Sequence, residues 1–342
     1  MKFQLPINIP RLAQPIRYTD RILLIGSCFT EHMTGRLAGH KFRTLQNPHG
    51  ILFNPLSVAR SLMSYATEKQ YDESELFYLN ELWGTWDHHS LFSHINKQAA
   101  LEGINSSQTK AARFIRESDW VIITLGSAFQ YFLTEEALKQ TNFPTQSSLL
   151  GGRGGVANNH RAPAAWFEKQ LLGIPAIISA LEDVLAVISR LNPKVQYLFT
   201  ISPVRHSRDG VVDNNRSKAR LIEAVHHLCT SHSSCHYFPA YELVIDVLRD
   251  YRFYDIDLVH PNYAATEAVW DAFVTACIEQ NAIPLMQQVK EIMTARSHRP
   301  RFPDTEAHRK FMQTYAEKVA VLAAAYPYLN LADEAQYFHA VE

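Results

Sequence analysis

Cysteine is scarce in this sequence. Of 342 residues only Cys28, Cys229, Cys235 and Cys277 are cysteines, and no two of them form a CxxC pair. Disulfide-stabilised secreted domains and cysteine-based zinc sites need more cysteines at closer spacing. The scarcity argues against both and favours a reducing compartment, so we expect a cytoplasmic protein.

An excess of charge and long apolar runs are also missing. Lys and Arg number 33 against 34 Asp and Glu, which gives no electrostatic footprint for nucleic acid or anionic lipid. No apolar run approaches the roughly 20 residues that span a bilayer. Prolines and arginines interrupt residues 1–18 before a signal-peptide apolar region can form. We therefore expect no nucleic-acid partner and no membrane association, whereas the oligomeric state stays open.

What the sequence does contain is an alternation of short apolar segments with amphipathic helical segments. Strands are predicted at 22–26, 119–126, 195–202 and 235–244, with a possible fifth at 41–46. Helical patterns cover 55–69, 176–191 and 217–232. Near-continuous apolar strands between such helices are typical of a parallel sheet that is covered on both faces. The pattern predicts a three-layer α/β/α protein with an open, mostly parallel, doubly wound sheet of about five strands.

Two long segments and the C-terminal end depart from this alternation. Residues 70–107 are rich in aromatic and polar side chains, and residues 134–165 contain the stretch GGRGG. Both are longer than ordinary connections in α/β domains, and such loop insertions are often functional. From residue 283 the chain is helical in pattern and highly charged. We predict one domain over 1–282 and a helical C-terminal extension over 283–342.

The first predicted strand ends at a potential nucleophile. In RILLIGSCFTEHM, residues 21–33, the apolar strand runs into Gly26 and Ser27, and Thr30 with Glu31 marks a plausible helix start. Ligands of open α/β sheets bind beyond the carboxyl ends of the strands. A serine here would have its hydroxyl in that crevice and its backbone N–H free to stabilise an oxyanion. Small residues could equally serve a tight turn, so this motif needs a partner.

A histidine and an aspartate near residue 260 could be that partner. A serine needs a base to take its proton. Among 16 histidines His260 stands apart, because Asp257 precedes it by three residues and a helix is predicted to begin near Ala264. Within one turn the carboxylate can reach the imidazole and set its tautomer, which leaves the other nitrogen for Ser27. Cys28 is a weaker candidate nucleophile, because buried cysteines are usually inert.

Several stretches resemble one known family. GSCFT at 26–30 is similar to the motif that gives the GSCFA family its name, with threonine in place of the last alanine. Further similar stretches are NPHGILFNPLS (47–57), NNHRAP (158–163), SPVRH (202–206) with DG at 209–210, SKA (217–219) and LRDYRFYDIDLVHP (248–261). The resemblance extends over residues 1–280. The family looks like a branch of the SGNH (GDSL-type) hydrolases, which are three-layer α/β/α esterases and related acyl-processing enzymes.

The resemblance implies roles for individual residues. Ser27 matches the nucleophile of the first sequence block, and Asp257 with His260 matches the DxxH block. Gly50, shortly after the candidate second strand, is placed like the glycine whose N–H helps to form the oxyanion hole. The N–H of Ser27 would be a further donor of that hole.

The third block of the superfamily, GxND, is only partly matched. Gly126 corresponds to its glycine, but Ala128 stands where the oxyanion asparagine should be. Asn158, in NNHRAP, is the candidate replacement for that amide. The alternative is a polar loop residue that makes local turn bonds.

Three further residues are predicted to contact substrate. Arg205 follows a predicted strand and should lie at the rim of the site, where it could hold an anionic group or form a structural ion pair. His88, in the stretch DHHS, and His160 belong to the two long segments. Neither has the spacing of a known metal-binding helix, so we expect no metal. We also expect no cofactor.

The leading interpretation is a serine hydrolase. It would cleave an acyl ester, short-chain or acetyl, of a small molecule or a glycan through a Ser27–His260–Asp257 triad. Two alternatives stay open. The same residues with an alcohol acceptor would give an O-acyltransferase, and the missing asparagine is compatible with a non-catalytic binding module on a hydrolase fold.

Overall fold

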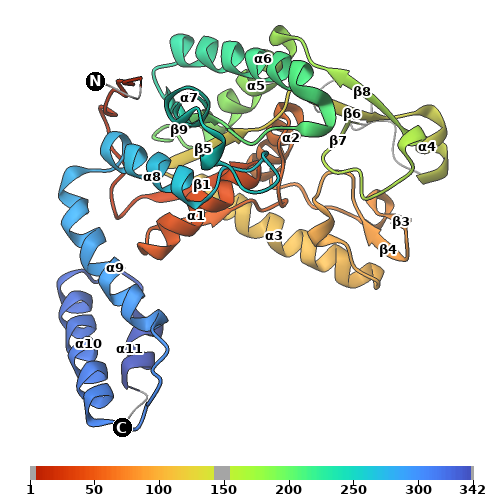
Figure 1. Ribbon diagram of the computed structural model, residues 1–342. Helices are drawn as coiled ribbons and strands as arrows, with labels where there is room; N and C mark the ends of the chain where they lie inside the picture. Colours follow the sequence, from red (N-terminus) through yellow and green to blue (C-terminus); the bar gives the residue numbers. More distant parts are fainter. Residues whose placement is uncertain (1–4, 142–154, 340–342) are drawn as a thin grey trace.

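The centre of the molecule is a parallel five-stranded sheet (Figure 1). The computed structural model describes residues 5–141 and 155–339, so residues 142–154 of the second long segment and its GGRG stretch lie outside the described residues. The strands are β1 (Arg21–Gly26), β2 (Arg43–Gln46), β5 (Trp120–Leu125), β9 (Gln196–Ile201) and β10 (Cys235–Tyr237). All five predicted strands are present, the possible one at 41–46 as β2. The predicted strand 235–244 ends early, and α7 (Ala240–Glu242) with a π-helical turn (Leu243–Leu248) follows it.

The order of the strands sets one position in the sheet apart. The strands lie side by side as β10-β9-β5-β1-β2. The chain starts at β1, moves outward to β2, and then returns to the other side of β1 for the remaining three strands. Where the direction of winding reverses, between β1 and β5, the connections at the carboxyl ends diverge and leave a crevice. Gly26 and Thr124 are register partners at this position.

Helices bury both faces of the sheet. Successive side chains of a strand point to opposite faces, and in β1 Ile22 and Leu24 pack into one core while Leu23 and Ile25 pack into the other. Helices α1 (Cys28–Gly39) and α8 (Tyr263–Cys277) cover the first face. The second face is covered by α2 (Pro55–Ala66), α3 (Lys97–Glu117), α5 (Ile174–Leu191) and α6 (Gly210–Ser231). The predicted three-layer α/β/α architecture is confirmed.

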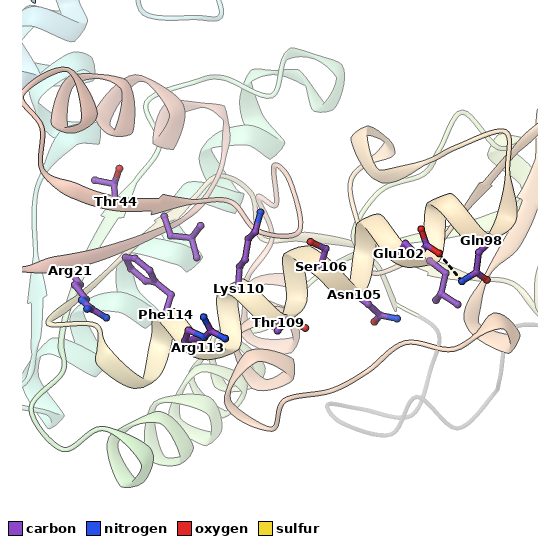
Figure 2. Close-up of a pocket in the computed structure, with 12 residues that line it drawn as sticks. Arg21, Thr44, Gln98, Glu102, Asn105, Ser106, Thr109, Lys110, Arg113 and Phe114 are labelled. Carbon is purple, nitrogen blue, oxygen red and sulfur yellow. Dashed lines mark hydrogen bonds between the residues drawn. The ribbon is translucent and has the colours of Figure 1, made fainter. Parts of the chain in front are cut away.

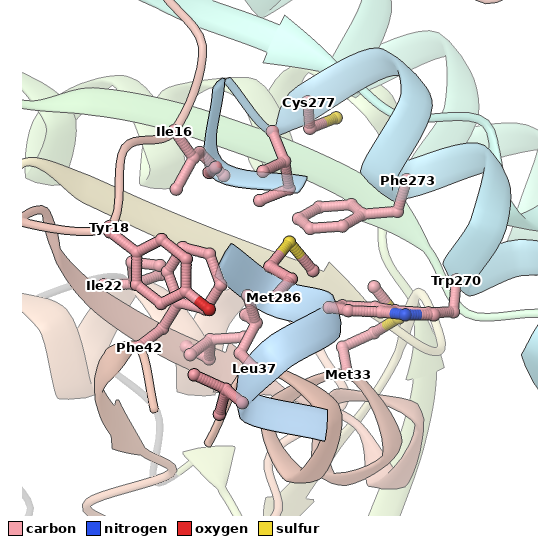
Figure 3. Packing of buried hydrophobic residues seen from close by; sticks show 14 of the residues in the cluster. Ile16, Tyr18, Ile22, Met33, Leu37, Phe42, Trp270, Phe273, Cys277 and Met286 are labelled. Atoms are coloured by element: carbon pink, nitrogen blue, oxygen red, sulfur yellow. The ribbon is translucent and has the colours of Figure 1, made fainter. Parts of the chain in front are cut away.

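The core of the first face continues into the C-terminal helices α9 (Ile283–Ser297), α10 (Glu306–Ala325) and α11 (Ala332–His339). Figure 1 shows these helices extending away from the sheet, and Figure 3 shows Met286 of α9 close to Phe273 of α8. Next to them the rings of Tyr18 and Phe42 stack with their centroids 4.3 Å apart. The C-terminal region is therefore helical, as predicted. No helix of residues 5–141 and 155–339 has both the length and the apolar character that crossing a membrane requires.

A buried carboxylate also joins the C-terminal helices to the rest of the chain. Glu334 of α11 is fully buried and forms ion pairs with Lys41, at 2.7 Å, and with Arg296 of α9. Lys41 lies between α1 and β2, so this network connects the two ends of the chain. An unpaired charge in that position would be costly, which makes the three residues mutually dependent.

Short strands and helices occur in the described parts of the two long segments and directly beside them. Residues 70–107 contain the antiparallel hairpin of β3 (Phe77–Leu79) and β4 (Leu82–Gly84), and they also contain the start of α3. A separate antiparallel sheet is formed by β6 (Phe129–Leu133), β7 (Gly155–Val156) and β8 (Phe167–Leu171), with α4 (Glu135–Thr141) between the first two. The described residues of these insertions thus include short strands and helices. Strands of two to five residues are too short to give a recognisable alternation.

Gly26 makes a very close backbone contact between β1 and β5. Its φ of +143° disfavours any L side chain, and a Cβ at this position would lie 2.1 Å from the Thr124 carbonyl oxygen. The Gly26 N–H donates to Asn47 Oδ1 at 2.9 Å, and the Gly26 carbonyl accepts from the Leu52 N–H at 3.0 Å. The Ser27 N–H extends the ladder by donating to the Thr124 carbonyl at 3.0 Å. Only glycine fits this turn.

Two buried histidines lie near the β3–β4 hairpin. The rings of His49 and His88 have centroids 3.8 Å apart, and both side chains are almost fully buried. His49 Nε2 contacts Gln108 Oε1 at 2.9 Å, and His88 Nδ1 contacts the Thr85 hydroxyl at 2.6 Å. The second nitrogen of each ring has no partner among the described residues. Burial lowers the pKa of His49 to about 4 and the pKa of His88 well below its ordinary value, so both rings are neutral at pH 7.

We predict that Gly26→Ala destabilises the protein by about 3 kcal/mol or more, because a methyl group would need both an unfavourable φ and a separation of β1 from β5. Chemical denaturation measures the change. Gly35→Ala is the matched control, since a Cβ there meets nothing within 4 Å and alanine is the better helix former. A Gly26→Ala variant within about 1 kcal/mol of the wild type would contradict the close contact.

We predict that the protein loses stability as the pH falls from about 6.5 towards 4. In that interval the unfolded histidines, with a pKa near 6.5, bind protons that buried His49 and His88 do not bind, so acid favours unfolding. His49→Gln should reduce the slope of unfolding free energy against pH by up to about 1.4 kcal/mol per pH unit. Denaturant midpoints measured across this interval test the prediction, with exposed His227→Gln as control. An unchanged slope in His49→Gln would refute it.

Candidate active site

Ser27 lies where β1 meets α1, beside the reversal of the sheet. It is the N-cap residue of α1, but its hydroxyl caps no N–H and has no hydrogen-bond partner among the described residues. The residue is only 4% exposed. A buried hydroxyl without a partner costs free energy, which indicates a role other than capping.

The backbone around Ser27 differs from the expectation in one respect. The Ser27 N–H donates to the Thr124 carbonyl, so the prediction that it is free to stabilise an oxyanion is wrong. Strand pairing continues one residue past β1 and uses this donor. The N–H groups of Cys28 and Phe29 come next, in the first turn of α1, where a helix has no carbonyl partners of its own to offer. Neither takes part in the strand pairing that uses the Ser27 N–H.

Asp257 and His260 form a close pair on the loop before α8. Asp257 Oδ2 lies 2.6 Å from His260 Nδ1, and Oδ1 accepts from the N–H groups of Val259 and His260 at 2.9 and 3.0 Å. The contact expected from the DxxH spacing is present. Its hydrogen bonds from His260 and Val259 lower the pKa of the Asp257 carboxyl to about 2, so the carboxylate is charged at neutral pH. With the proton on Nδ1 in this contact, Nε2 is the acceptor nitrogen of the ring.

Arg205 holds the loop that carries this pair. Its N–H donates to the Val259 carbonyl at 3.2 Å, and its guanidinium donates to the Leu258 carbonyl at 3.1 Å. The same guanidinium lies over the ring of Tyr254, 4.0 Å from the centroid. Arg205 therefore lies at the rim, as expected, and its donors contact the loop.

Ser27 and His260 line one cavity of about 860 Å³. The side chains of His260 and Asp257 are each 45% exposed, whereas Ser27 is buried. Of the two lining residues His260 is thus the exposed one and Ser27 the buried one. Ser27 and His260 are not hydrogen-bonded to each other in this structure. The fold brings Ser27 and His260 to one cavity, with Asp257 bonded to His260 and the serine–histidine contact open.

Gly50 has the left-handed conformation that a tight turn requires, with φ of +79°. Its N–H donates to the Asn47 carbonyl at 2.7 Å, within the turn. The residue does not line the cavity of Ser27. Its expected role as an oxyanion donor is therefore contradicted, because the N–H is used to shape the turn itself.

Asn158 and His160 line the same cavity as Ser27. Asn158 Oδ1 accepts from the His160 N–H at 2.8 Å. The ring of His160 contacts the Thr85 carbonyl through Nε2 at 3.0 Å and the Ser93 hydroxyl through Nδ1 at 3.5 Å. Burial lowers the pKa of His160 to about 4, so the ring is neutral. Both residues reach the cavity, and His160 mainly joins two insertions.

His88 is not a substrate-binding residue in this structure. It is fully buried beside His49 and does not line the cavity of Ser27. The sequence could not distinguish it from an exposed loop histidine, because the fold of residues 70–107 decides its burial. In the described part of the chain no group of three or more His, Cys, Asp or Glu side chains is arranged to hold a metal ion.

Two residues of the SKA stretch fix the strand ends below the cavity, a role that sequence reasoning did not find. Lys218 is 1% exposed, and its Nζ donates to the carbonyls of Gly126 and Ser202 at 2.6 Å each. Ser217 Oγ accepts from the Ala128 N–H at 2.7 Å. Burial lowers the pKa of Lys218 to about 7. The resemblance included this stretch, but a buried lysine gives no local signal of its own.

A second hollow of about 820 Å³ lies between α3 and the edge of the sheet (Figure 2). It is lined mainly by α3 side chains such as Lys110, Arg113 and Phe114, with Arg21 and Thr44 from the strands. None of the residues predicted for catalysis lines it. The cavity of Ser27 is therefore the candidate active site.

Comparisons with known proteins cover most of the chain. The model of the GSCFA family matches residues 21–273, and that of the GSCFA domain protein, C-terminal domain, matches residues 289–340. Comparison with curated proteins finds no match. A solved structure of an acetyl xylan esterase (Est2A) from the rumen bacterium Butyrivibrio proteoclasticus is 11% identical, with a TM-score of 0.31. That similarity covers 80% of this chain and 66%, just under two thirds, of the other. The GSCFA match alone spans more than half of this chain, so the chain belongs to the GSCFA family.

Proposed function

We propose that this protein is a serine hydrolase that cleaves an acyl ester. Ser27 would be the nucleophile, His260 the base, and Asp257 the residue that orients the base. One observation carries the proposal. An unpartnered serine hydroxyl and a histidine that is paired with an aspartate line one cavity at the carboxyl edge of a doubly wound sheet. The resemblance of the GSCFA family to SGNH hydrolases supports the same assignment of residues.

In the proposed reaction Ser27 Oγ attacks the carbonyl carbon of the ester while His260 Nε2 takes the hydroxyl proton. The electron pair of the C=O bond moves to its oxygen, and the N–H of Cys28 at the start of α1 is a donor for that charge. When the C=O bond re-forms, the bond to the alcohol breaks and His260 returns the proton to the leaving oxygen. Water then repeats the sequence on the acyl-enzyme and releases the acid.

The open contact between Ser27 and His260 has a simple route to closure. The Ser27 hydroxyl has no hydrogen bond to break, so its side chain can change rotamer at small cost. His260 is half exposed on a loop and can shift toward it. Catalytic hydrogen bonds are often long in unliganded enzymes and tighten when substrate binds.

The cavity favours a small acyl ester of a small molecule or a glycan. Its volume of about 860 Å³ is in the range of sites that enclose small ligands. Phe129 of β6 and Phe167 of β8 offer apolar walls. Arg161 and Arg208 also line the cavity. Such a lining suits a neutral or anionic ester better than a cationic one.

We predict that Ser27→Ala lowers the rate of p-nitrophenyl acetate hydrolysis by about 10³-fold or more, because triad residues act as a unit. Circular dichroism should show an unchanged fold. Ser106→Ala, in the second hollow, is the matched control. If Ser27→Ala keeps most of the activity, the nucleophile is a different residue.

A fluorophosphonate probe separates catalysis from simple binding. Wild-type protein should be labelled at Ser27, whereas a non-catalytic module would not be. Product analysis with an added alcohol then distinguishes the hydrolase from an O-acyltransferase, since transfer would give the new ester in place of the free acid.

We predict that Asp257→Asn costs no more activity than His260→Ala. The carboxylate orients and stabilises the imidazole, whereas His260 itself carries the proton. Initial rates of both variants on p-nitrophenyl acetate provide the comparison, and fluorophosphonate labelling should slow in the same order. A His260→Ala variant that outperforms Asp257→Asn would exclude His260 as the base.

A further inference from the structure

The loop that follows β5 lacks the side-chain donor that the resemblance leads us to expect. Ala128 stands in its place, fully buried, and its N–H donates to Ser217 Oγ at 2.7 Å. The N–H groups of Gly126 and Ser127 both donate to the Phe53 carbonyl, at 2.8 and 3.0 Å. No backbone donor of residues 126–128 is therefore left for an oxyanion.

His206 occupies the space beside the Ser27 side chain. A Cβ on Gly126 would lie 3.3 Å from Ser27 Cβ and 3.4 Å from His206 Nε2. The imidazole nitrogen, the serine side chain and Phe53 Cβ, at 2.8 Å, thus surround the position that a side chain of Gly126 would take. Both residues line the 860 Å³ cavity. The ring therefore lies beside the glycine of the GxND block, two residues before the position of its asparagine.

The surroundings of His206 orient its ring and leave both nitrogens unused. Its backbone N–H donates to Asn214 Oδ1 of α6 at 3.0 Å. The ring packs against Phe53, with centroids 5.3 Å apart. Within residues 5–141 and 155–339 neither ring nitrogen makes a hydrogen bond to protein. A ring held in this way is pre-organised for a ligand atom.

The charge state of His206 suits a donor better than a base. Burial lowers its pKa to about 4, and the positive charge of Lys218 acts in the same direction. The ring is therefore neutral at pH 7, with one N–H donor and one acceptor nitrogen. No carboxylate of the described residues is hydrogen-bonded to it, in contrast to His260 with Asp257. A neutral, partly buried donor stabilises developing negative charge without taking the proton of the nucleophile.

We infer that His206 is the side-chain oxyanion donor of this site, with its Nε2–H directed at the carbonyl oxygen of the ester. The inference rests on the proposed function. As Ser27 Oγ forms its bond to the carbonyl carbon, the C=O electron pair moves to oxygen and the hydroxyl proton goes to His260. The Nε2–H of His206 hydrogen-bonds to that oxygen and keeps its own proton throughout. The donor is released when the C=O bond re-forms and the alcohol leaves.

Asn158 is the competing candidate for the same role. It lines the cavity, but its Oδ1 is bonded to the His160 N–H. This bond ties its side chain to its own turn. His206, by contrast, approaches the Ser27 side chain directly across Gly126.

The test compares three variants in the full-length protein. His206→Phe keeps a packed ring but removes the donor, and His206→Gln restores an N–H in a side chain of similar reach. Asn158→Ala removes the competing donor. His227→Phe, an exposed histidine of α6, is the matched control for the ring substitution. The readouts are kcat and KM for p-nitrophenyl acetate, the rate of fluorophosphonate labelling at Ser27, and the melting temperature.

We expect His206→Phe to lower kcat by about 10²- to 10³-fold with little change in KM, as for other oxyanion donors. His206→Gln should recover at least about tenfold of that loss, and labelling of Ser27 should slow in parallel. A rate of His206→Phe within about threefold of wild type, or a hundredfold loss in Asn158→Ala alone, overturns the assignment. If His206→Phe is both inactive and unfolded, His206→Gln decides. A folded His206→Gln variant that is equally inactive would overturn the assignment.

The two proposals fail in different ways. If wild-type protein is neither active nor labelled at Ser27, the proposed function falls and the donor role falls with it. If wild type is labelled and His206→Phe is labelled at the same rate, only the donor role falls.

Discussion

The contact between Gly26 and the Thr124 carbonyl sets the position of the rest of the site. Because no side chain separates them, β1 and β5 stay paired up to their carboxyl ends, and the ladder includes the Ser27 N–H. α1 then begins at the next residue, Cys28. The backbone of the serine is consequently fixed between a strand end and a helix start, at the place in the sheet where neighbouring connections run in opposite directions.

Polar side chains secure the strand ends around this point. Asn47 binds the Gly26 N–H, Ser217 binds the Ala128 N–H, and Lys218 binds the carbonyls that end β5 and β9. These groups satisfy backbone atoms that lose their ladder partners where the strands stop. The carboxyl edge of the sheet is therefore a rigid floor. The half-exposed pair of His260 and Asp257 belongs instead to a loop above the sheet.

The sequence predicted the sheet, the layers and the Asp257–His260 contact, because each depends on local pattern or short spacing. It failed where the outcome depends on tertiary neighbours. Gly50 and Ser27 donate their N–H groups to carbonyls that no sequence spacing reveals. His88 is buried by insertions whose strands are too short to recognise, and Lys218 gains its partners only when β5, β9 and α6 assemble. The type of a residue indicates which chemistry it can perform, whereas the fold determines its hydrogen-bond partners.

Arg205 and His206 are adjacent in the chain, and they face different parts of the site. Arg205 donates hydrogen bonds to the carbonyls of Leu258 and Val259 in the loop of His260. His206 lies beside Gly126, on the side of Ser27. A displacement of the His260 loop would therefore pull on the segment that carries His206. The two histidines are thus coupled through Arg205, and a movement of the His260 loop when a substrate enters would also be felt by His206.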